Sequence, residues 1–465
     1  MLRDYAGLLT QGQTRWSIPP LSTMRNLLLA DALAAALLAG ESGLEQTVSR
    51  ATRTLGKKWP WLRLVAKRYL VVFNGPTRPR HQEVVRFLLR NPVFRGACTK
   101  YRHELRVQRW IAEPMRMHPA KAALDWNIPA ITTTGDLADW LGLTVSELDW
   151  FADLKGLGFR TSETRLRHYH YRILAKESGN LRMIEAPKTR LKQLQQKILR
   201  EILEKIPVHE AAHGFRKGRS IKTFVAPHTG QRVVVRMDLR DFFPSLSAAR
   251  IQTFFRTAGY PEDVADLLGG ICTNAVPLDT WSGAGLPVDR QCLREARDLY
   301  SRPHVPQGAP TSPALANLCF YRTDCRLAGL AKSAGAVYTR YADDLAFSGE
   351  EEFERRAYRF SLHAAAIVIE EGFQVRHRKT RVMRQSVRQH LAGLVANQHP
   401  NVRRTDFDRL KAILTNCVRH GPASQNRDGH EYWQEHLKGR IGFVESVNLA
   451  KGLRLRSIYD RIRWQ

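Results

Sequence analysis

The fold is decided by one stretch of the chain, Val337-Tyr338-Thr339-Arg340-Tyr341-Ala342-Asp343-Asp344-Leu345-Ala346-Phe347. Its β-branched, aromatic and apolar residues predict a single strand over 337–347 with two adjacent carboxylates at its centre. Because strand side chains alternate between faces, Asp343 or Asp344 must lie near hydrophobic neighbours. A bound divalent cation would offset that cost. The alternative is an exposed hairpin with acidic residues at its turn.

A second apolar run leads to another carboxylate. Residues 233–237 predict a buried strand that ends on Asp238. Three carboxylates on two adjacent strands would form the oxygen cage that Mg²⁺ prefers, with room left for water and substrate phosphates. Two such ions about 4 Å apart would activate an attacking hydroxyl and stabilise a leaving pyrophosphate.

The sequence before these strands mixes both kinds of secondary structure. Residues 168–174 and 181–184 read as a hairpin around the turn Ser178-Gly179-Asn180, and helical spacing follows Pro187. Strands and helices alternate too irregularly for a doubly wound parallel sheet. We therefore expect an α+β fold.

Composition limits the partners. The 465 residues carry 73 Lys and Arg against 44 Asp and Glu, a net charge of +29, which indicates a polyanionic partner and favours nucleic acid over membrane. Six cysteines form no C-x-x-C pair, so a zinc ribbon or disulfide scaffold is not expected. The longest apolar stretch, 27–40, is too short to span a bilayer. We expect a cytoplasmic protein without a membrane partner.

The N-terminal region differs in composition and pattern from the rest of the chain. Residues 1–125 look helical and basic, and clusters such as Lys57-Lys58 and Lys67-Arg68 alternate with Trp59, Trp61 and Tyr69. This pattern suits a nucleic-acid surface and solvated amphipathic helices equally well. Residues 133–148 contain a capping box of Thr144 with Glu147. A packed helical hairpin is favoured there over a DNA-reading helix-turn-helix.

Five blocks, in order, resemble the motifs of bacterial reverse transcriptases. The catalytic box is Tyr341-Ala342-Asp343-Asp344, and the first palm motif is Asp238-Leu239-Arg240-Asp241-Phe242-Phe243-Pro244-Ser245-Leu246. The P-Q-G-x-P-x-S-P box is residues 306–313. The fingers block begins at Arg182, and the next is Gly214-Phe215-Arg216-Lys217-Gly218-Arg219-Ser220. The resemblance covers about residues 165–445 and implies an RNA-directed DNA polymerase that uses dNTPs and two Mg²⁺ ions.

The resemblance implies a role for each matching residue. Asp238 and Asp343 would be the principal metal ligands, supported by Asp344 and by the carbonyl of Leu239. Phe243 corresponds to the steric gate that would exclude a ribose 2′-hydroxyl, while Phe242 or Phe243 could equally belong to the core. The residues expected to bind the incoming nucleotide are Lys176, Arg182, Phe243, Gln307 and Gly308.

The resemblance also extends through the C-terminal region. Lys379 is the candidate general acid for the departing pyrophosphate, although it could simply belong to a solvated basic cluster. Residues 391–397 resemble the primer grip. From Arg376 to the end there are 19 Lys and Arg against 7 Asp and Glu, as expected of a basic thumb along an RNA–DNA duplex.

The chain is most similar to retron-type enzymes, including those with long N-terminal extensions. The family implies a structured non-coding RNA as template and primer, branched RNA-linked DNA, anti-phage defence and a separately encoded effector. Two hallmarks differ: Phe224-Val225-Ala226-Pro227-His228 replaces N-A-x-x-H, and Leu391-Ala392-Gly393 replaces V-T-G. The alternatives are a non-retron defence-associated reverse transcriptase, a group II intron maturase and a catalytically silent RNA-binding scaffold.

The implied architecture is a right-hand polymerase with a helical N-terminal extension. We expect the extension over 1–160, fingers over 161–232, a palm with fingers insertions over 233–390, and primer grip and thumb over 391–465.

Overall fold

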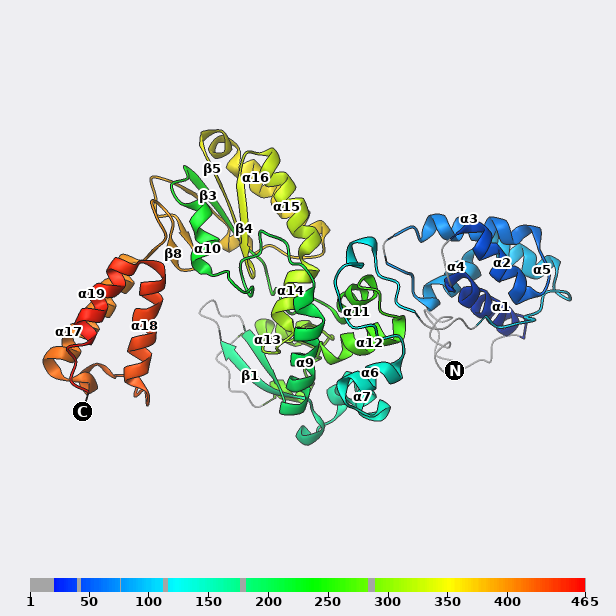
Figure 1. Cartoon of the computed structure of the whole chain (residues 1–465), viewed down its shortest axis with the longest axis horizontal. Helices are drawn as coiled ribbons and strands as arrows, with labels where there is room; N and C mark the ends of the chain where they lie inside the picture. The colour runs from blue at the N-terminus through cyan, green and yellow to red at the C-terminus, as the bar shows by residue number, and fades with distance from the viewer. Residues whose placement is uncertain are drawn as a thin grey trace. The chain divides into compact units, whose positions relative to one another are not determined.

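The computed structural model describes residues 21–39, 43–75, 77–111, 116–175, 181–282 and 289–464 (Figure 1). The chain divides into two compact units. One contains residues 1–122 with 256–262, and the other contains residues 123–255 with 263–465. The division at residue 122 precedes the boundary at 160 that we expected for the N-terminal extension.

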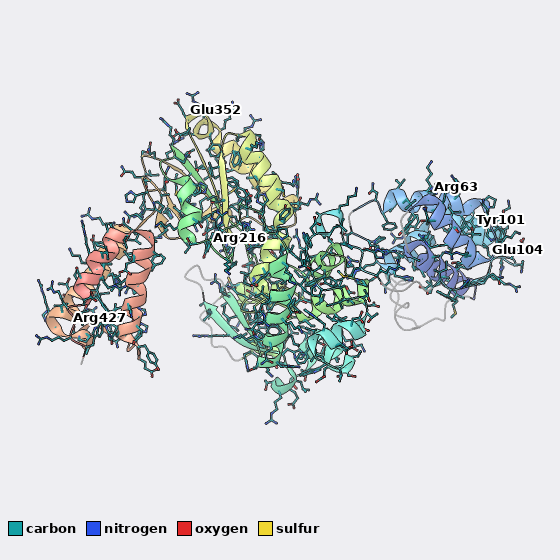
Figure 2. All side chains as sticks on the ribbon, viewed as in Figure 1. Arg63, Tyr101, Glu104, Arg216, Glu352 and Arg427 are labelled. Atoms are coloured by element: carbon teal, nitrogen blue, oxygen red, sulfur yellow. The ribbon has the colours of Figure 1, made fainter. Side chains whose placement is uncertain are left out.

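The described part of the first unit is helical. Its α-helices are α1 (Leu21–Leu38), α2 (Leu44–Leu55), α3 (Pro60–Val72), α4 (His81–Arg90) and α5 (Pro92–Lys100). Trp59, Trp61 and Tyr69 are buried in their shared core, whereas Arg63 is exposed (Figure 2). The aromatic residues of the suggested nucleic-acid surface therefore belong to the core, as expected of amphipathic helices, and contact of the exposed basic residues with nucleic acid stays a prediction.

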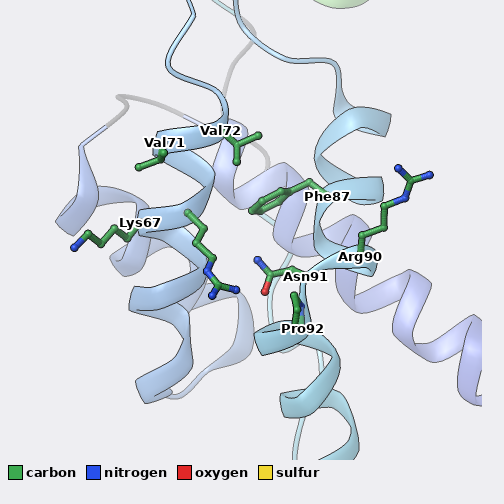
Figure 3. A pocket seen from close by; sticks show the side chains of 8 residues that line it. Lys67, Val71, Val72, Phe87, Arg90, Asn91 and Pro92 are labelled. Atoms are coloured by element: carbon green, nitrogen blue, oxygen red, sulfur yellow. The ribbon is translucent and has the colours of Figure 1, made fainter.

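A shallow groove marks the outside of this unit. It encloses about 530 Å³ between α3, the end of α4 and the start of α5 (Figure 3). Its lining residues are Lys67, Arg68, Val71, Val72, Phe87, Arg90, Asn91 and Pro92.

The second unit mixes helices and strands. Up to the first sheet strand it contains α6 (Thr134–Leu141), α7 (Val145–Ala152), α8 (Leu157–Arg160), β1 (Tyr169–Ala175), β2 (Leu181–Pro187), α9 (Thr189–Glu201) and α10 (Ile221–Val225). It continues with β3 (Val233–Asp238), α11 (Ala248–Thr257), α12 (Glu262–Ile271), α13 (Arg290–Tyr300), α14 (Ser312–Cys319), α15 (Tyr321–Ser333), β4 (Val337–Tyr341), β5 (Asp344–Gly349) and α16 (Glu351–Glu370). It ends with β6 (Arg381–Arg384), β7 (His390–Leu391), β8 (Leu394–Val395), β9 (Asn401–Val402), α17 (Arg404–His420), α18 (Trp433–Val447) and α19 (Leu449–Tyr459).

The second unit contains a four-stranded antiparallel sheet. Its order is β4-β5-β3-β6, so β3, which ends on Asp238, pairs directly with β5 (Figure 1). Helices α15 and α16 contact the sheet, as does α10. The run of valines at 233–235 is fully buried, as a strand covered on both faces requires.

Two predicted elements precede the sheet as expected. Strands β1 and β2 form an antiparallel hairpin from Tyr169↔Pro187 to Ala175↔Leu181. Helices α6 and α7 pack together, and Trp140 of α6 donates a 3.0 Å hydrogen bond to Glu201 of α9. The two helices form a packed pair, and Thr144 and Glu147 form the predicted capping box. The preference for a hairpin over a DNA-reading helix-turn-helix stays a prediction.

The C-terminal region combines a small sheet with helices α17–α19. Strands β7, β8 and β9 are antiparallel, and Ala392 and Gly393 form the β7–β8 turn with φ angles of 44° and 87°. Leu410, Leu437 and Leu455 belong to the core that this region shares with β3 and α10. Arg427 is exposed beyond α17 (Figure 2). Across the described ranges, no helix combines the length and apolar character needed to cross a membrane.

Candidate active site

The two adjacent carboxylates lie at a hairpin turn. Strand β4 ends at Tyr341, β5 begins at Asp344, and Ala342 between them has a left-handed φ of 55°. The predicted single strand over 337–347 is therefore wrong, because alanine gives no sequence signal for a left-handed residue. The alternative was a hairpin with exposed carboxylates. The structure has the hairpin, but Asp343 and Asp344 are half-buried.

Three carboxylates converge at this end of the sheet. Asp238 pairs in register with Asp344, and the amide of Leu239 donates a 2.9 Å hydrogen bond to the carbonyl of Asp343. Burial, together with the charges of Asp344 and Asp238, raises the pKa of Asp343 to about 6. Burial also raises the pKa of Asp344, although Arg236 opposes the shift. The site therefore concentrates negative charge where water is scarce.

Three basic side chains neutralise part of this charge. Arg236 donates two hydrogen bonds to Asp344 Oδ1, at 2.9 and 2.7 Å. Lys379 Nζ lies 3.3 Å from Asp238 Oδ1, and Arg376 Nη1 lies 3.5 Å from Asp238 Oδ2. Sequence reasoning missed Arg236 and Arg376. The period of two in β3 could have revealed Arg236, because it places that residue on the same face as Asp238.

The donor set fits a divalent cation. Asp238 Oδ2 is buried and accepts no hydrogen bond from any described residue. The neighbouring Asp343, whose pKa is raised by burial and by the charges of Asp344 and Asp238, would be stabilised by an approaching cation. Within the described part of the chain, no three His, Cys, Asp or Glu side chains are already grouped to hold a metal. A bound cation would compete with the contacts that Arg236 and Lys379 make to Asp344 and Asp238.

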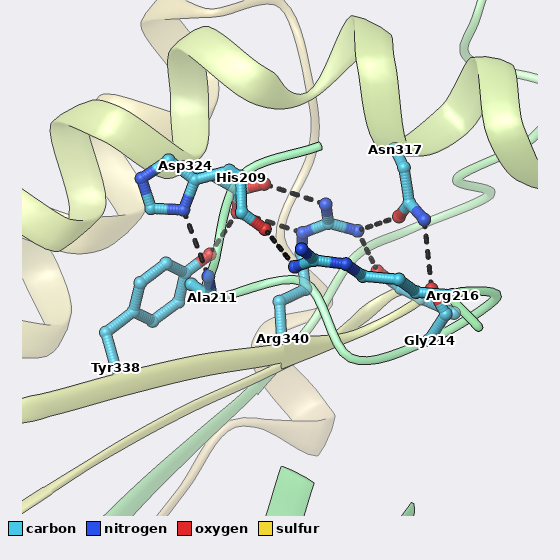
Figure 4. Close-up of polar contacts among 9 residues, drawn as sticks. His209, Ala211, Gly214, Arg216, Asn317, Asp324, Tyr338 and Arg340 are labelled. Atoms are coloured by element: carbon cyan, nitrogen blue, oxygen red, sulfur yellow. Dashed lines mark hydrogen bonds and ion pairs between the residues drawn. The ribbon is translucent and has the colours of Figure 1, made fainter. Parts of the chain in front are cut away.

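A buried ion pair lies behind the β4–β5 turn. Arg340 and Asp324 are both fully buried and are joined by hydrogen bonds of 2.7 and 2.9 Å (Figure 4). Arg340 also donates to Asn317 Oδ1 at 3.0 Å and to the Ala342 carbonyl at 3.1 Å. The turn is thus anchored by a side chain from its own strand.

The segment 211–214, which leads into the block at 214–220, supports the same turn. The Ala211 carbonyl accepts a 2.7 Å hydrogen bond from the Arg340 amide, and Asn317 Nδ2 donates to the Gly214 carbonyl at 2.9 Å (Figure 4). A Cβ on Gly214 would lie 2.6 Å from the Ala342 nitrogen. Glycine is needed here because two backbones approach closely.

The expected nucleotide-binding residues are placed unevenly. Phe243 is half-buried while Phe242 is core, so one of the two rings is available to a ligand. Arg182 lies exposed on β2. Lys176 lies outside the described residues.

Gln307 and Gly308 pack against β2. The Gln307 carbonyl accepts a 2.9 Å hydrogen bond from the Glu185 amide, and a Cβ on Gly308 would lie 2.8 Å from the Glu185 carbonyl. The buried Glu185 carboxylate pairs with His304 at 2.9 Å. Although burial opposes it, this contact raises the pKa of His304. Sequence reasoning missed this pair, which braces the loop carrying Gln307.

His228, retained from the altered N-A-x-x-H motif, is a buried structural residue. Its ring nitrogens lie 2.6 Å from Ser348 Oγ and 2.7 Å from Thr339 Oγ1, which join it to β5 and β4. Burial lowers its pKa to about 3, so the ring is neutral. Its polar atoms are used within the sheet and do not face a ligand.

Comparison with known proteins assigns a class to this site. Residues 174–400 match the family described as reverse transcriptase (RNA-dependent DNA polymerase). That span contains all three carboxylates and the hairpin, sheet and loops around them, so the fold and site define an RNA-directed DNA polymerase.

Individual relatives narrow the class. The chain is 38% identical to the retron Mx65 reverse transcriptase of Myxococcus xanthus over 334 residues, 71% of this chain and 72% of that protein. It is 37% identical to the retron Mx162 reverse transcriptase of the same organism, over 68% of this chain and 64% of that one. The chain is 30% identical to the retron Ec86 reverse transcriptase of Escherichia coli, over 63% of this chain and 82% of that protein. The chain belongs to the retron reverse transcriptases.

Proposed function

We propose that this polymerase copies a structured non-coding RNA into DNA and produces the branched RNA-linked DNA of a retron. The observation that carries the proposal is the convergence of Asp238, Asp343 and Asp344 where β3 pairs with β5 and the β4–β5 turn adjoins it. The proposed hand has an extension over 1–160, fingers over 161–232, a palm over 233–390 and a thumb over 391–465. The product duplex would follow the basic C-terminal region.

The chemistry follows from the carboxylates. Two Mg²⁺ ions, when bound, would lower the pKa of the primer hydroxyl and stabilise the leaving pyrophosphate. Asp238, Asp343 and the Leu239 carbonyl would hold them, and Asp344 would support the cage from its contact with Arg236. Lys379, whose Nζ is already beside Asp238, would donate a proton to the pyrophosphate oxygen.

The nucleotide side of the proposal uses the residues around this cage. Phe243 would lie beneath the sugar and collide with a 2′-hydroxyl. Arg182, together with Lys176, would bind the triphosphate through charge-assisted hydrogen bonds. Gln307 and Gly308 would contact the incoming nucleotide and its template base from behind, because their loop is held against β2.

The first test separates catalysis from RNA binding. Asp343→Asn should abolish DNA synthesis while RNA binding persists, because the substitution removes a ligand charge without removing basic surface. Glu352→Gln, on an exposed part of α16, is the matched control and should retain full synthesis. Synthesis by Asp343→Asn at the wild-type rate would refute the metal assignment.

A second test identifies the nucleic acid that the protein makes in its native host. We expect protein purified from its native locus to carry DNA joined to a short structured RNA through a link cut by a debranching enzyme. DNA without that link would favour a non-retron defence-associated enzyme. RNA without DNA, in a preparation that cannot extend a primer, would indicate a silent RNA-binding scaffold. A defence role, a separately encoded effector protein and a cytoplasmic location remain part of the proposal.

A further inference from the structure

Phe215 combines two features that structural residues rarely share. Its side chain is 50% exposed, and its backbone has a left-handed φ of 58°. Left-handed backbone is costly for any residue with a Cβ, and it persists where the surrounding structure over-determines it, often at functional sites. An exposed ring gives little core packing to offset that cost.

The surroundings fix the position of this residue. The preceding Gly214 is held by Asn317 and lies against the Ala342 nitrogen. The following Arg216 donates a 3.4 Å hydrogen bond to the His209 carbonyl (Figure 4). The Phe215 backbone is therefore attached on both sides to the network that anchors the catalytic turn.

The ring lies beside the active site. Its centroid is 6.0 Å from that of Phe243 and 6.5 Å from that of Tyr341, the last residue of β4 before the carboxylates. Phe243 has a further aromatic neighbour in the buried Phe242, at 5.8 Å. Phe215 is thus the exposed partner of the proposed steric gate.

We propose that Phe215 is a specificity-determining residue for the incoming nucleotide. One edge of its ring holds the Phe243 ring in the orientation that rejects a 2′-hydroxyl, and its exposed face packs against the nucleotide. This inference rests on the proposed role of Phe243. Aromatic contacts of this kind have preferred geometries, so removing one ring changes the orientation of the other.

The test is a two-residue cycle in the full-length protein. Phe215→Gly, Phe215→Tyr, Phe243→Ala and the Phe215→Gly/Phe243→Ala double variant are compared by the ratio of kcat/KM for dNTP to kcat/KM for rNTP. Phe215→Gly should lower this ratio by about threefold to tenfold, the size expected for one aromatic contact, mainly through a higher kcat/KM for rNTP, because the Phe243 ring is no longer held against the 2′-hydroxyl. Phe215→Tyr should keep the wild-type ratio. Phe215→Gly should add nothing once residue 243 is alanine.

Thermal unfolding excludes a folding defect. Glycine tolerates a positive φ, so Phe215→Gly should melt near the wild-type temperature, because relief of backbone strain offsets weaker packing and added flexibility. An unchanged ratio in Phe215→Gly, beside a lowered ratio in Phe243→Ala, would overturn the inference and leave the gate intact. If Phe215→Gly lowered the ratio equally in the wild-type protein and in the Phe243→Ala variant, Phe215 would not act through the Phe243 ring, and the inference would be overturned. No effect of Phe243→Ala would remove both the gate and the inference that rests on it.

Discussion

At the scale of single residues, Asp343 places an energetic burden on the folded protein. Its pKa of about 6 in the folded state lies above the ordinary aspartate value of 3.8, because the side chain is buried near two other carboxylates. A carboxyl whose folded pKa is raised binds its proton more tightly in the folded than in the unfolded chain. Asp343 therefore reduces stability at neutral pH, and the reduction disappears as the pH falls through 6 towards 4.

We accordingly expect Asp343→Asn to raise the free energy of unfolding of the metal-free protein by roughly 1–3 kcal/mol at pH 7.5, with a smaller gain at pH 4.5. Denaturant titrations at both pH values measure this. The Glu352→Gln control should change the free energy of unfolding by less than about 1 kcal/mol, since the ion pair of Glu352 with Arg356 is exposed. A variant that is less stable than wild type at pH 7.5 would contradict the argument.

For the buried pair of Arg340 and Asp324, removing the carboxylate should lower the free energy of unfolding, the opposite of the change expected at Asp343. Asp324→Ala should lower the free energy of unfolding by about 3–5 kcal/mol, because it leaves an uncompensated guanidinium in the core. Thermal unfolding checks this against Glu351→Ala, which breaks the exposed pair of Glu351 with Arg355 and should cost less than about 1 kcal/mol. Equal losses in the two variants would show that burial does not control the effect.

At the scale of elements, the β4–β5 turn depends on a segment more than a hundred residues earlier. Gly214→Ala should displace the turn, because the new Cβ would meet the Ala342 nitrogen at 2.6 Å. We expect kcat for dNTP incorporation to fall roughly tenfold to hundredfold, as misplaced catalytic groups usually cause. Gly329→Ala, on α15 with open space around its Cβ, should leave kcat unchanged. Wild-type kcat in Gly214→Ala would show that the two backbones can separate freely.

Elements with a clear period were predictable, and contacts between distant segments were not. The valines of β3, the β1–β2 hairpin and the capping box at Thr144 all follow local rules and were confirmed. The β4–β5 hairpin was missed because its turn uses an alanine at positive φ. The burial of Arg340 could not be predicted, because a charged residue in a strand normally faces solvent unless a partner such as Asp324 arrives from elsewhere.

At the scale of the whole molecule, the net charge of +29 implies salt-dependent RNA binding. Arg419, Arg427 and Lys438 are exposed in the C-terminal helical region. Replacing each with Gln should reduce the slope of log affinity against log salt concentration by about one for each phosphate-binding cation removed, with KM for dNTP unchanged. Fluorescence anisotropy with a hairpin RNA measures the slope. Arg355→Gln, already paired with Glu351, is the control, and an equal reduction there would point to unspecific attraction.

The ion pairs around the carboxylates have a practical consequence for handling the enzyme. Arg236 and Lys379 already stand as counter-charges to Asp344 and Asp238, so removal of the divalent ion by a chelator leaves these two carboxylates partly neutralised. Chelation should therefore produce a folded resting form, and dialysis back into Mg²⁺ should restore the original specific activity without a refolding step. We therefore expect the metal-free enzyme to be a reversible off-state.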